Sequence, residues 1–279
     1  MYFIIRGFTV TLASSAICYH TCMALLALFG CLVLAIWAYM TLWFLLARLL
    51  QRSDAVDTAW GLGFVVVVWL AWLIASRHAD IHLLAVGLVS LWGLRLAVHI
   101  TQRNRKKTED YRYVRYWEKW GDNYWLRAYF RIFLTQGLLV LIISTPLVGI
   151  MHSQHVDSSL VAVTGVIVWA AGIVFEAEAD NELARFIKTK KPGQIMTKGV
   201  WRYSRHPNYF GEVIAWWGAA IVALSMGQWW GIIGAITITI LITKVSGIPP
   251  LERHYVGNKN FEAYKRRTSI FVPLPPRKI

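Results

Sequence analysis

The stretch Gly199-Val-Trp-Arg-Tyr-Ser-Arg-His-Pro-Asn-Tyr-Phe-Gly-Glu212 marks the point where a basic loop becomes a hydrophobic helix. We predict that the helix begins at Pro207, because proline is favoured at the first helical position and an apolar run extends from Tyr209 to Met226. The amides of the first turn have no partners within the helix and carry the positive end of its dipole. A basic loop followed by a long apolar helix is typical of a membrane protein.

Polar side chains surround this helix start. Arg202, Arg205 and His206 precede it, and together with the first-turn amides they predict a site for an anion. Asn208 and Glu212 are four residues apart and therefore share a helix face. Glu212 would lie about one turn inside the membrane, where a carboxylate is costly and usually functional. The arginines alone could be ordinary positive-inside residues, but that interpretation does not account for Glu212.

The composition indicates a polytopic membrane protein. Of 279 residues, 57% are hydrophobic and 16% are charged, whereas about 25% of residues are charged in soluble proteins. The net charge of +14 arises from Lys and Arg clusters in the loops, which fit membrane lipids with anionic heads and a phosphorylated cofactor better than nucleic acid. We expect no metal site, because the spacing of Cys18, His20 and Cys22 fits no common one.

We expect an all-α membrane bundle of about seven transmembrane helices. Residues 1–22 would be an N-terminal extension or signal-like segment, and residues 23–279 a single membrane domain. The expected spans are about 23–47, 58–76, 81–100, 129–150, 158–175, 208–226 and 229–247. The basic loops then all fall on one side, which the positive-inside rule makes the cytoplasmic side. Aromatic and charged residues at helical spacing in the 101–128 loop predict an amphipathic surface helix.

Acidic residues stand at two other helix ends. Asp57, at the mouth of the second span, could be an N-cap or first-turn acid that interacts with the helix dipole. It could also serve the chemistry, paired with Arg95 of the neighbouring span. The fifth span ends in the acidic run 176–182, which includes Asp180 and is followed by Arg185. This collar could be a solvated helix exit, or its acids could hold ribose hydroxyls while its bases hold phosphates.

The expected topology brings the polar residues to one end of the bundle. At the cytoplasmic end we place Asp57, Arg95, Asp180, Arg202, Asn208, Glu212 and Tyr264. These residues predict a polar cavity with a basic rim that faces the cytoplasm and opens into an apolar bundle. A nucleotide from the cytosol and a lipid from the membrane could meet there.

Three segments carry a resemblance to a known family. The run 202–212, the segment 57–61 (Asp-Thr-Ala-Trp-Gly) and the tail 264–273 resemble the steroid 5-alpha-reductase-like membrane proteins of bacteria. These proteins belong to a superfamily of steroid and sterol reductases and isoprenylcysteine carboxyl methyltransferases. The resemblance covers nearly all of the chain after the first 22 residues. It implies a seven-helix protein of the bacterial inner membrane that holds NADPH in its cytoplasmic half.

The resemblance also implies which residues bind the cofactor. Asn208 and Glu212 match the family's element near the nicotinamide end, and residues 253–255 lie where the family has basic and aromatic contacts. The full set for NADPH is Asp180, Arg185, Arg202, Arg205, His206, Asn208, Tyr209, Glu212, Arg253, His254, Tyr255 and Tyr264. NADPH is expected rather than NADH, because a 2′-phosphate requires Arg or Lys and the loops are basic.

The chain departs from the steroid enzymes at the substrate. Those enzymes grip the substrate ketone with a Gln-Glu pair on the second helix and a tyrosine on the third. Here Asp57 is the nearest acid, and no tyrosine occurs between residues 81 and 105. We predict a monomeric NADPH-dependent reductase of an activated carbon–carbon double bond in a lipid-like or steroid-like substrate. Its catalytic residues would be Asp57, Arg95 and Glu212, with Asp57 polarising or protonating the substrate.

Two other functions fit parts of the sequence. A methyltransferase that uses S-adenosylmethionine would share the Arg-His-Pro-x-Tyr element, but Glu212, the acidic run and the single Glu252 disfavour it, because methyltransferases tend to have paired glutamates there. A transporter or lipid-binding scaffold would carry polar residues near the bilayer midplane. Here the polar residues, apart from Gln136, lie at one end of the spans, which disfavours this function.

Overall fold

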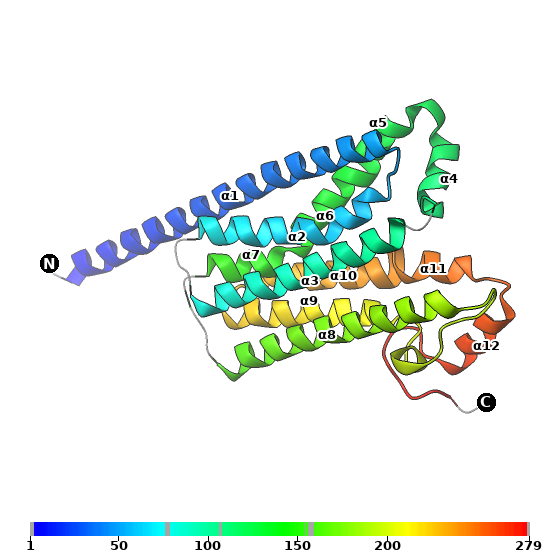
Figure 1. Ribbon diagram of the computed structural model, residues 1–279. Coiled ribbons are helices and arrows are strands. Elements are labelled where there is room, and N and C mark those ends of the chain that lie inside the picture. Colours follow the sequence, from blue (N-terminus) through cyan, green and yellow to red (C-terminus); the bar gives the residue numbers. More distant parts are fainter. Residues whose placement is uncertain (1–2, 76–78, 106–107, 154, 156–158, 278–279) are drawn as a thin grey trace. The chain divides into compact units, whose positions relative to one another are not determined.

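The chain folds into α-helices that form two compact units. The computed structural model describes residues 3–75, 79–105, 108–153, 155 and 159–277, with backbone alone for residues 3–22 (Figure 1). The two units are Met1–Leu141 and Ile142–Ile279. The described residues include six helices that are long and apolar enough to cross a membrane: Met23–Leu50, Ala55–Ile74, Asp80–Arg105, Tyr111–Ile143, Leu160–Thr189 and Trp229–His254. The predicted class, a polytopic helical membrane protein, is confirmed.

The predicted sixth span is not among these six helices. It corresponds to α9 (Pro207–Ser225), which begins at Pro207 as predicted. Asn208, Glu212 and several glycines and tryptophans lower its apolarity. Within its unit, α9 is covered by α7, α8 and α10. A helix that packs largely against protein does not need the apolar surface of a helix that faces lipid, so its lower apolarity fits its position.

The first unit consists of consecutive helices from the N-terminal half of the chain. Its elements are α1 (Phe3–Leu50), α2 (Ala55–Ile74), α3 (Asp80–Arg105), α4 (Tyr111–Trp120), η1 (Gly121–Asn123), α5 (Tyr124–Ala128), η2 (Tyr129–Leu134) and the start of α6 (Thr135–Ile143). α1 joins residues 3–22 to the first predicted span as one continuous helix. α2 packs closely on α3, because a Cβ on Gly61 would lie only 2.8 Å from the Gly93 carbonyl oxygen.

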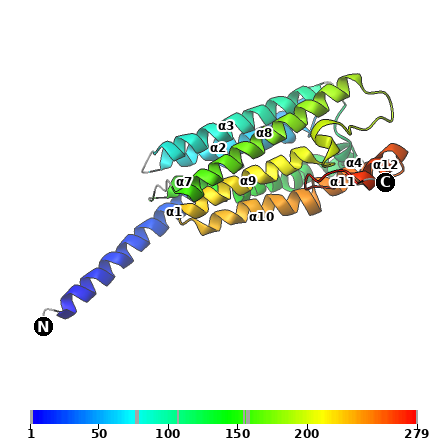
Figure 2. The same ribbon diagram turned by 90° about the horizontal axis from the view of Figure 1, so that it is seen from below.

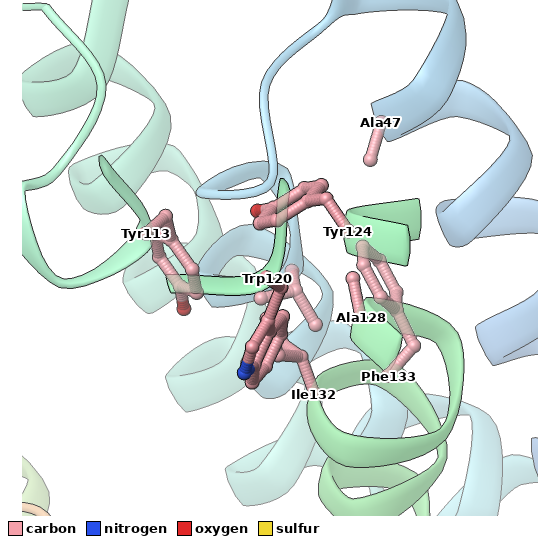
Figure 3. Close-up of a cluster of buried hydrophobic side chains, with 8 residues drawn as sticks. Ala47, Tyr113, Trp120, Tyr124, Ala128, Ile132 and Phe133 are labelled. Carbon is pink, nitrogen blue, oxygen red and sulfur yellow. The ribbon is translucent and has the colours of Figure 1, made fainter. Parts of the chain in front are cut away.

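The predicted amphipathic helix of the 101–128 loop is confirmed as α4. It buries Tyr113 and Trp120 and exposes Arg115, Glu118 and Lys119. The buried face joins a cluster formed by Ala47, Val56, Tyr113, Trp120, Tyr124, Ala128, Ile132 and Phe133 (Figure 3). The hydroxyl of Tyr124 donates to Ser53 Oγ at 2.6 Å, so its polar tip is also satisfied. The cluster therefore packs α4 and α5 against the end of α1 and the start of α2.

The second unit is organised by α8 and α9, which run side by side (Figure 2). Its elements are α7 (Thr145–His152), α8 (Leu160–Thr189), η3 (Gly199–Arg202), α9, η4 (Trp229–Gly231), α10 (Ile232–Ile240), η5 (Leu241–Val245), α11 (Ile248–His254) and α12 (Lys259–Arg267). Two glycines on each helix line the contact. A Cβ on Gly211 would lie 2.6 Å from the Glu176 nitrogen, and one on Gly218 would lie 2.3 Å from the Trp169 nitrogen. Only glycine permits this approach.

The fifth predicted span is longer than expected. The sequence placed its end near Phe175, whereas α8 continues to Thr189. Residues 177–188 are mostly good helix formers, so the helix has no local reason to stop at the acids. Glu176 and Asp180 are consequently inside the helix, and they are 3% and 5% exposed. The interpretation of these two acids as a solvated helix exit is therefore wrong.

Candidate functional site

The contact between α8 and α9 brings predicted cofactor residues together. The Asn208 side-chain amide donates to Asp180 Oδ1 at 3.2 Å. Glu212 lies one turn further along the same helix and is half-buried. Because Gly211 lies directly on the backbone of Glu176, the two helices place three carboxyl groups and one amide near the same crossing. Carboxylates within membrane helices are costly and usually functional, which makes the crossing a candidate ligand site.

Arg205, directly before this site, has a different environment from the one predicted. It is buried, and its Nε and Nη2 atoms each lie 2.7 Å from Glu252 Oε1. Its Nη1 donates to the carbonyl oxygens of Thr268 at 2.7 Å and Lys265 at 3.3 Å. His206 Nε2 lies 3.3 Å from the same Glu252 oxygen. Glu252 thus supplies a carboxylate to both side chains, and contact of Arg205 and His206 with phosphates stays a prediction.

The C-terminal tail is bonded to the same stretch. Arg205 N donates to the Ser269 carbonyl oxygen at 2.9 Å, and Ser204 Oγ donates to the Phe271 carbonyl oxygen at 2.7 Å. The Tyr264 hydroxyl donates to the carbonyl oxygens of Trp201 and Ser204. Burial raises the pKa of Tyr264, so the hydroxyl stays protonated and keeps donating at physiological pH.

The remaining predicted cofactor residues of this unit lie closer to solvent. Arg202 is exposed beside the Tyr203 ring, and Arg185 is 70% exposed with Glu178 at 3.9 Å. Residues 253–255 at the end of α11 are also exposed. Tyr209 is half-buried, and its ring stacks on that of His206. Apart from the buried Arg205 and His206, the unit therefore combines buried acids with exposed bases.

Asp57 in the first unit is held by residues that the sequence did not predict. Its Oδ2 accepts from Arg112 Nη2 at 2.8 Å, and its Oδ1 accepts from the Tyr113 hydroxyl at 2.7 Å. Arg103 Nη2 lies 3.9 Å from Oδ2. Arg95 is half-buried on α3, close to the Gly61–Gly93 contact, and its pairing with Asp57 stays a prediction.

The guanidinium of Arg112 is fixed from a second side. Asp110, the N-cap residue of α4, accepts from the Arg112 backbone amide and from Nε, both at 3.0 Å. Burial alone would raise the pKa of Asp110, but the hydrogen bonds from Arg112 outweigh it and lower that pKa. Arg112 is therefore shared between two carboxylates, which keeps it close to Asp57.

Sequence reasoning missed Tyr113, Arg112 and Glu252. The substrate-gripping tyrosine was expected on the third span, whereas Tyr113 lies on the buried face of the helix that follows it, α4. The apolar spacing of α4 could have indicated that face. No local signal identifies Glu252, because its partner Arg205 is 47 residues away in the sequence.

Comparison with known proteins identifies a family and several distant relatives of the chain. A family model described as "Protein of unknown function (DUF1295)" matches residues 43–268. The chain is 28% identical over 113 residues to 3-oxo-5-alpha-steroid 4-dehydrogenase 1 of Rattus norvegicus, covering 40% of each protein. It is 28% identical over 112 residues to the Bos taurus enzyme of that name, covering 40% of this chain and 41% of the relative.

A plant relative extends this comparison. Steroid 5-alpha-reductase DET2 of Arabidopsis thaliana is 35% identical over 71 residues, covering 25% of this chain and 26% of the relative. In each case the chain spans less than half the length of the curated relative. No solved structure matches the chain. The predicted resemblance to steroid 5-alpha-reductases is confirmed as a distant similarity.

Proposed function

The chain belongs to the DUF1295 family, and we propose that it is a membrane reductase that uses NADPH to saturate an activated carbon–carbon double bond of a lipid-like substrate. The similarity to steroid reductases supports this class of reaction. The observation that carries the proposal is the contact of 2.7 Å between the buried Tyr113 hydroxyl and the Asp57 carboxylate. A phenol aligned by a carboxylate can polarise the carbonyl that activates such a double bond.

The residues of the second unit fit NADPH. Asp180 and Glu176 are buried carboxylates that can accept from ribose hydroxyls or from a carboxamide, and Asn208 can both donate and accept. Arg202 and Arg253 are exposed cations suited to phosphates. Bases of this kind favour a cofactor that carries a 2′-phosphate.

In the proposed reaction, NADPH would supply the hydride, and a proton from solvent would complete the reduction of the double bond. Tyr113 would donate a hydrogen bond to the substrate carbonyl, which takes the place of Asp57 as its acceptor. Before the substrate binds, Asp57 orients the phenol, and Arg112 and Arg103 hold the carboxylate in place. Glu212 shares a helix face with Asn208 and would orient the cofactor from α9. We assign the site to the cytoplasmic side of a bacterial inner membrane, because basic loops favour that orientation.

Ligand-induced stabilisation of the detergent-purified protein tests the cofactor. We expect NADPH to raise the thermal midpoint, since a ligand at a hundred times its dissociation constant stabilises the folded state by about 2.7 kcal/mol. Glu212→Ala should lose the shift, whereas the matched change Glu178→Ala, at an exposed site on α8, should retain it. A shift with S-adenosylmethionine and none with NADPH or NADH contradicts the proposal and makes methyl transfer the working function.

Turnover tests the role of Asp57. With hydrophobic enones as substrates, oxidation of NADPH can be followed by its absorbance. Asp57→Asn keeps the size of the side chain but cannot hold the phenol as a charged acceptor, so we expect turnover to be lost while the NADPH-induced shift remains. Full activity in this variant would remove Asp57 from the mechanism.

A further inference from the structure

Glu252 joins parts of the second unit that are distant in sequence. It lies near the end of α11, and its Oε1 is bonded to Arg205 and close to His206 in the segment before α9. The Arg205 side chain is 6% exposed and that of Glu252 is 14% exposed. The pair is therefore largely shielded from water, and a charge in such a place needs its partner to remain stable.

Arg205 also binds the end of the next helix. The carbonyl oxygens of Lys265 and Thr268, which accept from its Nη1, belong to the last turn of α12 and the residue that follows it. Carbonyls at a helix C-terminus lack partners within the helix and carry the negative end of the dipole, so a guanidinium is a favourable cap. All three nitrogens of the Arg205 guanidinium are thereby engaged within the protein.

The tail completes the connection. Residues 204 and 269 form a parallel bridge, and Leu274 N donates to the Tyr203 carbonyl oxygen at 3.0 Å. The segment directly before α9 is thus bonded to α11, to α12 and to the tail, while α9 itself begins two residues after Arg205.

We propose that Arg205 and Glu252 are positioning residues that anchor α11, α12 and the tail to the segment before α9 and so set the direction of its first turn. That turn carries Asn208, which meets Asp180 on α8. The inference rests on the proposed function in one respect, that this turn holds the nucleotide. It assigns Arg205 a role different from that of a phosphate ligand, since its donors are already occupied by Glu252 and two carbonyls.

Glu252→Gln distinguishes these two roles by the sign of its effect. If Arg205 positions α9, losing the charge of Glu252 loosens the anchor, and we expect NADPH affinity to fall about tenfold, a change typical of coupled neighbours. If Arg205 is a phosphate ligand, losing Glu252 frees its guanidinium and NADPH binds more tightly. NADPH titrations are made at a temperature where every variant is folded. Glu262→Gln changes an exposed acid on α12 and is the matched control.

Limited trypsin digestion provides a readout that does not depend on NADPH. The last turn of α12 offers exposed cleavage sites at Lys265, Arg266 and Arg267, which the anchor would protect by holding this turn folded. We expect faster cleavage there in Glu252→Gln, and also in Arg205→Lys, which keeps the charge but cannot reproduce the forked contacts. Unchanged cleavage in both variants overturns the inference.

The two readouts separate the two proposals. If the wild-type protein does not bind NADPH, the proposed function fails, and the trypsin comparison still decides whether the anchor exists. If cleavage accelerates while NADPH affinity is unchanged or higher, the anchor holds the tail but does not position α9, and the inference is wrong.

Discussion

Each unit of the molecule holds one carboxylate between an arginine and the ring of the residue that follows it. In the first unit Asp57 is bound by Arg112-Tyr113, at 2.8 and 2.7 Å. In the second unit Glu252 is bound by Arg205-His206, at 2.7 and 3.3 Å. The Arg112 side chain is 38% exposed, whereas that of Arg205 is 6% exposed. The same local pattern therefore operates in two different environments.

The difference in exposure separates a reactive role from a structural one. A partly hydrated pair can exchange partners at low cost, because water replaces a lost contact. That property suits Asp57, which in the proposed reaction must release the Tyr113 hydroxyl to a substrate. A buried pair cannot exchange partners cheaply, because each charge depends on the other. That property suits Arg205 and Glu252 as an anchor.

Arg205→Ala should produce the largest effect on stability. It removes the main partner of Glu252, whose side chain is only 14% exposed, and uncaps the end of α12, so we expect the free energy of unfolding to fall by about 3 to 5 kcal/mol. Denaturation of the purified protein in detergent measures the change. Arg205→Met combined with Glu252→Leu should recover part of the loss, because no unpaired charge remains. A loss below about 1 kcal/mol in the single variant would show that the pair is not shielded from water.

Tyr113→Phe should separate turnover from stability. The phenylalanine retains the packing of the ring, and Asp57 keeps Arg112 as a partner, so we expect a loss of about 1.5 kcal/mol in stability. Turnover of an enone should fall much further, because the donor to the substrate carbonyl is gone. Parallel measurements of thermal midpoint and NADPH oxidation test this. Activity that falls only as far as stability does would make Tyr113 a structural residue.

Arg112→Ala should have a smaller effect than the matching change at Arg205. Its side chain is partly hydrated, and Asp57 retains Tyr113 and the nearby Arg103. We expect a loss of about 1 kcal/mol in the free energy of unfolding. Arg115→Ala, at an exposed site on the same helix, is the control and should change stability by less than about 0.5 kcal/mol. A loss as large as that of Arg205→Ala would remove the distinction between the two pairs.

Local patterns in the sequence predicted much of this fold. Proline before an apolar run located the start of α9, and the spacing of aromatic residues located α4. Both features depend on residues within a few turns of each other. The length of α8 was underestimated because buried acids resemble a helix exit when only composition is considered. Their burial depends on the close approach of Gly211, which no local pattern reveals.

The pairings at the two carboxylates could not be predicted in the same way. Tyr113 lies 56 residues from Asp57, and Glu252 lies 47 residues from Arg205. Sequence analysis supplied the acids and bases, and it proposed Arg95 for Asp57 and phosphates for Arg205. Which base meets which acid is set by helix packing, which joins positions that share no local signal. Residue types therefore predicted which acids and bases are present, whereas tertiary contacts determine which of them pair.

Salt should produce the smallest effect and the most direct test of the comparison. Added chloride screens exposed charges, because the Debye length falls from about 10 Å at 0.1 M to about 3 Å at 1 M. Double-mutant cycles give the coupling energy within each pair at both concentrations. We expect the coupling of Arg112 to Asp57 to fall by about 0.3 kcal/mol and that of Arg205 to Glu252 to change less. The Arg112 side chain is 38% exposed and that of Arg205 is 6% exposed, while Asp57 and Glu252 are similar at 13% and 14%. Equal salt dependence would mean that both pairs are hydrated, and the assignment of one to reactivity and the other to anchoring would lose its physical basis.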